Sequence, residues 1–272
     1  MENKGNTDIQ FLSILHQESI LKSIDKDAWY YNMNHKNRGK AIIFNHEKFE
    51  IGNFQSRAGS RLDCFNLESS LQKLGFDVTP YVDLTLDQLD KTLDYWAKED
   101  HSQYDCLLMV ILSHGDKGII YAKDGVYKPE DKLWERFTDD KCPTLVGKPK
   151  LFFIQACQGD RFDRGVTLRT QVDGSSSFMI PMNVDFLVVF GSVPGFYSWR
   201  NVLKGSWLIQ ALCNAFDKYG FTLDLLTLLT YVNRQVAIEF ESSVPNDVSK
   251  NKMKETIFII SKLTKLVKFE KK

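Results

Sequence analysis

Short, unbroken apolar runs constrain the fold of this chain more than any other feature. Six of them, four to eight residues long, are typical of buried strands: Ala41–Phe44, Val78–Val82, Asp105–Leu112, Leu151–Ile154, Phe186–Phe190 and Ile257–Ile260. A strand without polar alternation has to be covered on both faces of its sheet. The runs therefore predict a mostly parallel sheet between two layers of helices.

Helical patterns lie between these runs. Leucines at three- and four-residue spacing predict one helix that stops at Gly75 and a second that begins after Thr85. Two more helices are expected over Ser206–Tyr219 and Thr222–Phe240. The alternation of strands and helices predicts the α/β class, with a six-stranded, mostly parallel sheet and helices on both faces.

Composition and charge exclude several classes of protein. The chain has 272 residues, 43% of them apolar, and its 35 basic and 35 acidic residues give a net charge of zero. A zero net charge argues against nucleic acid as the main partner. The longest apolar runs are too short to cross a membrane, and the first ten residues lack the apolar region of a secretory signal. We therefore expect a cytoplasmic protein with no membrane partner.

The cysteines and two irregular segments complete this outline. Five cysteines without a CxxC pair favour free thiols over disulfides or a metal site, and no cofactor is expected. Residues 1–27 are too short for a domain, and about twenty residues from Asp160 to Pro181 lack any period between two core strands. Such a loop is usually functional or disordered. The lysine-rich segment Lys262–Lys272 is expected to form a solvated edge strand.

Two residues with nucleophilic chemistry follow predicted strands. His114 comes just after the strand that ends at Leu112, and Cys157 just after the strand that ends at Ile154. The carboxyl ends of parallel strands are where ligands bind in open sheets. An imidazole near a thiol can take its proton, and glycines beside both residues leave backbone N–H groups free for an oxyanion. A cysteine at a strand end is more often an inert core residue, so the pair is a hypothesis at this point.

Longer motifs make the chain resemble the caspase family. Gln-Ala-Cys-Gln-Gly at residues 155–159 matches the nucleophile signature of caspases, with His114 lying 43 positions upstream. SRAG at 56–59, LSHGDKGIIYAKDG around His114, VPGFYSWRN at 193–201 and GSWLIQALC at 205–213 extend the resemblance over nearly the whole chain. The sequence of these motifs is most similar to that of short-prodomain effector caspases of insects. Gln158 and Gly191 are small departures, because arginine and Ser or Thr are commoner there.

The resemblance implies a three-layer caspase-like sandwich and an endopeptidase that cleaves proteins after aspartate. Cys157 would attack the peptide carbonyl, and His114 would move the protons, oriented by the backbone carbonyl of Gln55. The backbone N–H groups of Gly115 and Cys157 would form the oxyanion hole.

The same resemblance implies the substrate pockets. The residues that would clamp the aspartate are Arg57, Gln155 and Arg200. Tyr197, Ser198, Trp199 and Trp207 would bind the preceding substrate residues, and Asn201 would receive an aspartate at the fourth position before the cut. Guanidinium groups suit a carboxylate because they bind it with two charge-assisted hydrogen bonds.

Processing and partners are further expectations. A cut after Asp173 would activate a zymogen, and the propeptide would end at Asp27 or Asp25. The expected units are then a propeptide 1–27, a large subunit 28–173, a linker 174–182 and a small subunit 183–272, active as a homodimer of large-plus-small units. An upstream initiator caspase and inhibitor-of-apoptosis proteins are the expected partners, the latter through Ala28.

Two alternatives compete with the enzyme. A catalytically weak, caspase-like binding module or decoy has no physical need for intact Cys157, His114, Arg57 and Arg200 together. A thiol redox protein needs a resolving cysteine, and the chain has no CxxC pair to supply it.

Overall fold

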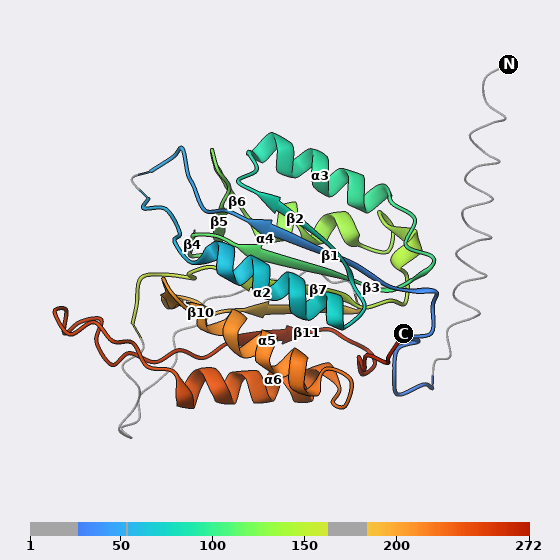
Figure 1. The fold of residues 1–272 in the computed structure, drawn as a ribbon. Helices are drawn as coiled ribbons and strands as arrows, with labels where there is room; N and C mark the ends of the chain where they lie inside the picture. Colours follow the sequence, from blue (N-terminus) through green and yellow to red (C-terminus); the bar gives the residue numbers. More distant parts are fainter. Residues whose placement is uncertain (1–26, 53, 163–183) are drawn as a thin grey trace, which may run out of the picture.

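A six-stranded sheet forms the centre of the computed structural model, which describes residues 27–52, 54–162 and 184–272 (Figure 1). The strand order is β11-β8-β7-β3-β1-β2. Neighbours are parallel except that β11 runs antiparallel to β8. The strands are β1 (Asn37–Asn45), β2 (Asp77–Val82), β3 (Tyr104–Leu112), β7 (Lys150–Gln155), β8 (Phe186–Phe190) and β11 (Phe258–Ser261). The predicted six-stranded, mostly parallel sheet is confirmed.

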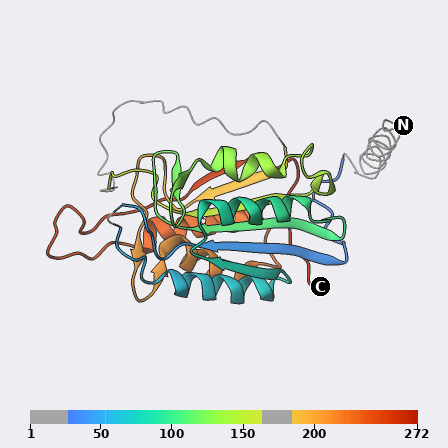
Figure 2. The same cartoon turned by 90° about the horizontal axis from the view of Figure 1, so that it is seen from above.

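Helices cover both faces of the sheet and make three layers (Figure 2). One face carries α2 (Ser60–Lys73), α5 (Trp207–Tyr219) and α6 (Leu225–Arg234). The other carries α3 (Leu86–Lys98), α4 (Pro129–Lys132) and a 3-10 helix (Trp134–Phe137). Within β3, Leu108 packs with the first group of helices, whereas Met109 packs with the second. Because each strand feeds two cores in turn, its apolar run has no polar alternation.

Local capping explains where two helices begin. The Thr85 hydroxyl accepts the N–H of Gln88 at 3.2 Å, and the Gln88 side chain accepts the N–H of Thr85 at 3.0 Å, so α3 begins with a capping box as its sequence predicts. The expected start of the last helix at Thr222 is wrong. The Asp224 side chain accepts the N–H groups of Leu226 and Thr227, so α6 begins at Leu225 and continues after Arg234 as a π-helix, Gln235–Glu239.

The C-terminal segment differs from its prediction. Strand β11 ends at Ser261, and residues 262–272 form no edge strand, although Leu266 makes an isolated bridge with Tyr30. Phe269 is buried, and its ring lies 5.6 Å from that of Phe76. Lys272 ends the chain in an ion pair of 2.8 Å with the buried Asp105. Long-range packing of the apolar residues between the lysines therefore outweighs the lysine-rich pattern.

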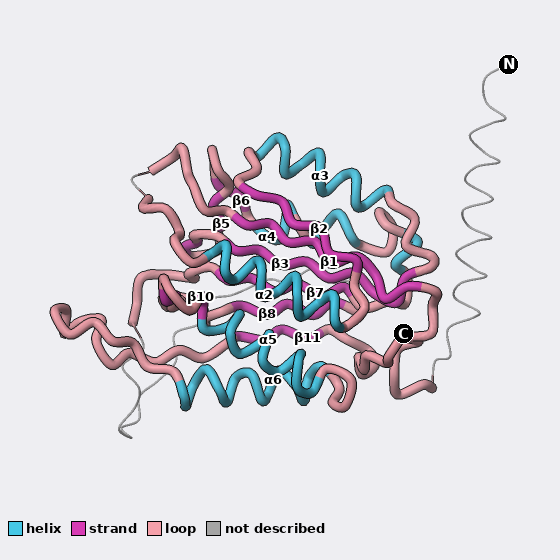
Figure 3. The backbone as a smooth tube through the Cα atoms, viewed as in Figure 1, coloured by secondary structure: helices cyan, strands magenta, loops and turns pink. Residues whose placement is uncertain are grey.

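Loops and small elements gather where β1, β3 and β7 end (Figure 3). They are β4 (Gly115–Asp116), β5 (Ile119–Tyr121) and β6 (Val126–Tyr127), and the hairpin of β9 (Arg200–Asn201) and β10 (Gly205–Ser206). A 3-10 helix (Pro143–Leu145) leads into β7. Among the described residues, no helix has the length and hydrophobicity needed to span a membrane.

Candidate active site

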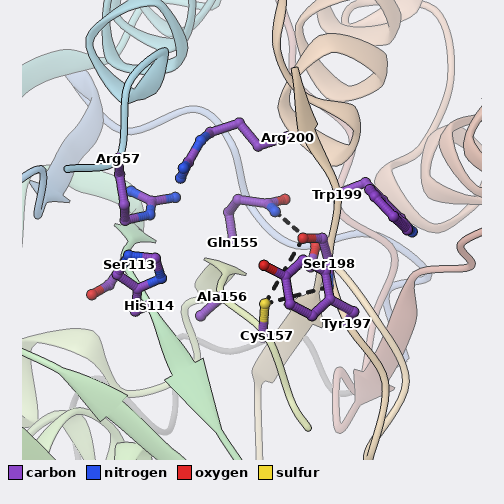
Figure 4. Close-up of a pocket in the computed structure, with 10 residues that line it drawn as sticks. All are labelled: Arg57, Ser113, His114, Gln155, Ala156, Cys157, Tyr197, Ser198, Trp199 and Arg200. Atoms are coloured by element: carbon purple, nitrogen blue, oxygen red, sulfur yellow. Dashed lines mark hydrogen bonds between the residues drawn. The ribbon is translucent and has the colours of Figure 1, made fainter. Parts of the chain in front are cut away.

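His114 and Cys157 come together because β3 and β7 are neighbours in the sheet. Leu112 of β3 is aligned with Gln155 of β7, and each site residue lies two positions further along its chain. Both line one cavity of about 170 Å³ at the carboxyl end of the sheet (Figure 4). The sequence predicted that each residue follows a strand, but only the order of the strands in the sheet shows that the two residues are close together.

Cys157 differs from the other cysteines in its exposure. All five cysteines are free, and Cys64, Cys106, Cys142 and Cys213 are buried, whereas Cys157 is only partly so. Its Sγ donates to the carbonyl of Ser198 at 3.8 Å and accepts the Ser198 N–H at 3.5 Å. Burial raises the pKa of the thiol, against the lowering effect of the Ser198 backbone. Cys157 is therefore a protonated thiol beside the backbone of Ser198.

Two phenylalanines and one carbonyl hold the imidazole of His114. The Phe54 ring stacks on it, with centroids 4.8 Å apart and an angle of 20°, and the Phe49 ring lies at 4.9 Å. Nε2 of His114 lies 3.4 Å from the carbonyl oxygen of Gln55. Sequence reasoning identified Gln55 but missed both phenylalanines.

The environment of His114 keeps it neutral. Burial, together with the charge of Arg57, lowers the pKa of His114 to about 4. A neutral imidazole can accept a proton, so its charge state suits a general base for the thiol.

Gly115 lies against the backbone of the nucleophile. A Cβ at this position would come within 2.5 Å of the carbonyl oxygen of Cys157 and 2.9 Å of the Ala156 side chain. The close approach therefore requires glycine. In the part of the chain that the structure describes, the backbone N–H of Cys157 donates to no other residue. The Gly115 backbone thus packs against that of Cys157, and the oxyanion hole expected from these two N–H groups stays a prediction.

One buried and one partly buried arginine form a positively charged wall of the cavity. Arg57 is 2% exposed and donates from Nη1 to the carbonyl of His46 at 3.1 Å. Burial, and next the charge of Arg200, lower the pKa of Arg57 to about 9. Burial also lowers the pKa of Arg200, and its Nε has no hydrogen-bond partner among the described residues.

The described residues around the cavity do not pair these two arginines with an anionic side chain. Neither arginine forms an ion pair with a carboxylate of the described chain. The charge of Asp63 acts on both arginines, but the Asp63 carboxylate oxygens already accept two hydrogen bonds from Ser206. The Ser206 backbone N–H donates at 2.8 Å and the Ser206 hydroxyl at 2.6 Å. Gln155 adds an amide to the same wall. Two desolvated guanidinium groups at an open cavity are suited to an anionic ligand.

The predicted aromatic residues are only partly at the cavity. Tyr197 and Trp199 line it, with Ser198 between them. Trp207 lies behind Trp199 instead, with the two rings stacked at 5.8 Å, and does not line the cavity. Phe162, which sequence reasoning missed, lies 5.2 Å from the Tyr197 ring.

Asn201 also lies outside the cavity lining. Its side-chain oxygen accepts the N–H groups of Leu203 at 2.8 Å and Lys204 at 3.0 Å and so closes the β9–β10 turn. Its amide nitrogen is the part of the side chain left for a substrate carboxylate.

The expected cleavage positions lie at or beyond the described residues. Asp173 and Asp25 fall outside them, while Asp27 is the first described residue and is exposed. Just after Asp27, the Trp29 carbonyl accepts the N–H of Leu266 at 2.8 Å, and the N–H of Tyr31 donates to the Leu266 carbonyl at 3.0 Å. The chain is thus anchored within a few residues of Asp27.

The described residues include no cluster of three or more His, Cys, Asp or Glu side chains that could hold a metal ion. The residues that line the cavity bring together a thiol, an imidazole and two guanidinium groups.

Comparisons with known proteins agree with this geometry. The family described as Caspase domain matches residues 38–268. Caspase-1 of Spodoptera frugiperda is 52% identical over 92% of this chain and 84% of its own length, and caspase drICE of Drosophila melanogaster is 48% identical over 94% and 77%. The crystal structure of Spodoptera frugiperda caspase-1 matches with a TM-score of 0.85 and 51% identity, over 92% of this chain and 98% of that one. The chain belongs to the caspase family and is a cysteine endopeptidase of the effector type.

Proposed function

We propose that this caspase cleaves its protein substrates after aspartate, with Cys157 as the nucleophile. The observation that carries the proposal is a pair of arginines, Arg57 buried and Arg200 partly buried, which line the cavity of Cys157 without a carboxylate partner among the described residues. An aspartate side chain supplies the missing anion and receives bidentate hydrogen bonds. An uncharged residue in its place leaves both cations desolvated and unpaired, so selectivity for aspartate over asparagine is on the order of 10⁴.

The geometry supports a two-residue mechanism. His114 takes the thiol proton as Sγ of Cys157 bonds to the substrate carbonyl carbon, and the N–H groups of Gly115 and Cys157 donate to the resulting oxyanion. The carbon–nitrogen bond then breaks while His114 returns the proton to the leaving amine. Water, deprotonated by the same imidazole, attacks the acyl-enzyme and releases Cys157. The carbonyl of Gln55 and the rings of Phe49 and Phe54 orient the imidazole throughout.

The segment from Tyr197 to Asn201 binds the substrate backbone. The Ser198 carbonyl lies beside Sγ of Cys157 at 3.8 Å, where it can accept the N–H of the substrate aspartate. An extended peptide along this segment adds a short strand, and its side chains meet the rings of Tyr197 and Trp199.

Activation by a cut after Asp173 is the second part of the proposal. The segment that ends in Val172-Asp173 and continues with Gly174 has the form of a caspase's own site. The chain is then a zymogen, with 28–173 as large subunit, 183–272 as small subunit and 174–182 as the linker between them. An upstream initiator caspase of the cytoplasm makes the first cut in the cell.

Intact mass after expression in a bacterium tests the nucleophile and the processing site together. Wild type is expected as two chains split after Asp173, while Cys157→Ala and Asp173→Ala stay whole. The control is a lysate of the same bacterium without the gene, which should leave purified Cys157→Ala protein whole. With that control met, a Cys157→Ala chain that is still split would contradict the proposal.

A homodimer is proposed from the free edge of β11. Ile259 and Ile260 on this strand are only partly buried, and among the described strands β11 pairs with β8 alone. A second copy can continue the sheet there. Sedimentation should give a dimer for wild type and a monomer for Ile260→Lys, and equal masses would contradict the assignment.

An inhibitor-of-apoptosis protein is proposed to bind Ala28 once Asp27 is cut. The bond between the Trp29 carbonyl and Leu266 has to open for a binding groove to receive the new terminus. Ala28→Met in the processed enzyme should weaken the binding of such an inhibitor domain, and unchanged affinity would rule out this site.

A further inference from the structure

Glu255 is a buried acid that the mechanism above does not use. It precedes β11 in the chain and is 2% exposed. Its Oε2 accepts the backbone N–H of Trp199 at 2.5 Å, and its Oε1 lies 3.3 Å from the hydroxyl of Ser198. No lysine or arginine of the described chain pairs with it. A carboxyl group held this way serves the segment that faces the substrate.

The contacts of Glu255 continue to the wall of the aspartate pocket. Ser198 Oγ accepts Nε2 of Gln155 at 2.7 Å, a bond drawn in Figure 4. Gln155, Ser198 and Glu255 thus form one buried chain of hydrogen bonds, with Gln155 at the cavity and Glu255 furthest from it. Oε1 of Gln155 has no partner among the described residues, so the bond to Ser198 is what fixes which end of the amide faces the pocket.

Gly191 provides the space for this chain of hydrogen bonds. A Cβ there would lie 2.7 Å from Ser198 Oγ and 2.8 Å from Gln155 Oε1. The absence of a side chain at Gly191 and the presence of Glu255 therefore both act on the Ser198 hydroxyl.

We propose that Glu255 is a positioning residue for the aspartate pocket. Through Ser198 it fixes the amide of Gln155, and through the N–H of Trp199 it fixes the backbone beside Cys157. It touches neither the substrate nor the reacting atoms. The inference rests on the proposed site and adds to it a determinant of substrate affinity.

The charge state of Glu255 decides which variant preserves this role. Burial raises the pKa of Glu255 well above its usual range and so favours the neutral carboxylic acid, which can donate one hydrogen bond and accept another. A neutral acid also avoids a negative charge near the thiol of Cys157 and the substrate carboxylate, because an ionised Glu255 would raise the pKa of Cys157. Glutamine has the same donor and acceptor pair in nearly the same shape.

Kinetics of three variants of the processed enzyme test the inference, with a peptide that ends in aspartate. Glu255→Gln should keep KM and kcat within about threefold of wild type, whereas Glu255→Leu should raise KM about tenfold with kcat within threefold, since two hydrogen bonds to the substrate-binding wall are lost. The control is Glu241→Gln, an exposed acid of the same region, which should leave both constants unchanged. A wild-type KM for Glu255→Leu would overturn the inference.

A double-mutant cycle with Ser198→Ala separates positioning from general destabilisation. In the Ser198→Ala background, Glu255→Leu should raise KM only about threefold, because the contact through Ser198 is already gone. A full tenfold effect there would show that Glu255 does not act through Ser198. If Glu255→Leu fails to fold, Ser198→Ala alone must still raise KM at constant kcat. An unchanged KM for Ser198→Ala would overturn the proposed role of this chain of hydrogen bonds.

Cys157→Ala distinguishes failure of this inference from failure of the proposed site. If Cys157→Ala is inactive while Glu255→Leu behaves as wild type, only the role of Glu255 is wrong. If Cys157→Ala still turns over the peptide, the site itself is wrong.

Discussion

At the scale of single residues, the pocket couples binding to the charge of the base. Arg57 lowers the pKa of His114, and Arg57 and Arg200 lack a carboxylate partner in the described chain. A bound aspartate carboxylate offsets this positive charge and so makes the imidazole a better acceptor of the thiol proton. Binding of the correct substrate therefore supports the first proton transfer.

The acid limb of activity follows from the lowered pKa of His114. An unperturbed histidine would lose half of its neutral form near pH 6.5. With a pKa of about 4, the imidazole stays neutral as the pH falls, so kcat/KM should remain within about twofold between pH 7 and pH 5.5. A half-loss at pH 6.5, measured on enzyme whose fold is intact at each pH, would contradict this environment for His114.

The stacked ring of Phe54 gives a second prediction at this scale. Phe54→Leu removes the stacking on His114 but keeps an apolar side chain, so kcat should fall about three- to tenfold with KM within threefold. Phe65→Leu is the matched control, because Phe65 is 68% exposed on α2. Equal kcat values for the two variants would show that the stacking does not position the imidazole.

At the scale of elements, the strands were the most predictable part of the molecule. Burial on both faces leaves an apolar run without interruption, and such a signal is local to the strand. The start of α6 was missed because Asp224, and not the first apolar residue, caps it. The C-terminal segment was missed because Phe269 finds its partner Phe76 far away in the sequence.

The capping box of α3 tests whether an element's start affects the site. Thr85→Ala removes the hydroxyl that accepts the N–H of Gln88 and should lower the free energy of unfolding by about 1 kcal/mol. Kinetic constants should not change, because α3 lies on the face of the sheet away from α5. Urea unfolding beside Thr92→Ala, a partly buried threonine within the same helix, measures the difference. Equal stability of the two variants would contradict the role of the cap.

At the scale of the whole molecule, buried histidines link stability to pH. Burial lowers the pKa of His46 to about 4, and neither ring nitrogen has a hydrogen-bond partner in the described chain. Below pH 6.5, His46 therefore binds a proton in the unfolded state but stays neutral in the folded state. His46 thus contributes a loss of stability that grows as the pH falls from about 6.5 towards 4.

Replacing His46 by phenylalanine should remove this part of the pH dependence. Between pH 7 and pH 5, the wild type should lose about 2 kcal/mol more of its free energy of unfolding than His46→Phe. Urea titrations of both proteins at the two pH values give the comparison. Parallel losses would show that His46 takes up its proton as readily in the folded state as in the unfolded state.

The candidate site was predictable only in part. Cys157, His114 and the two arginines were identified by motifs within short segments. Phe54 and Glu255 were missed because their roles depend on contacts with residues 56 or more positions away, which no local pattern records. Residues that support a site are chosen by the packing of the whole chain, and so they emerge only from its structure.

We propose that the thiol of Cys157 attacks the carbonyl carbon of an aspartate whose side-chain carboxylate lies between Arg57 and Arg200. The most direct test is kcat/KM of the processed enzyme for two peptides that differ only in aspartate or asparagine before the cut, with Cys157→Ala as the blank. We predict a ratio on the order of 10⁴ in favour of aspartate and no turnover by Cys157→Ala. A ratio near one, or turnover by the alanine variant, would contradict the account.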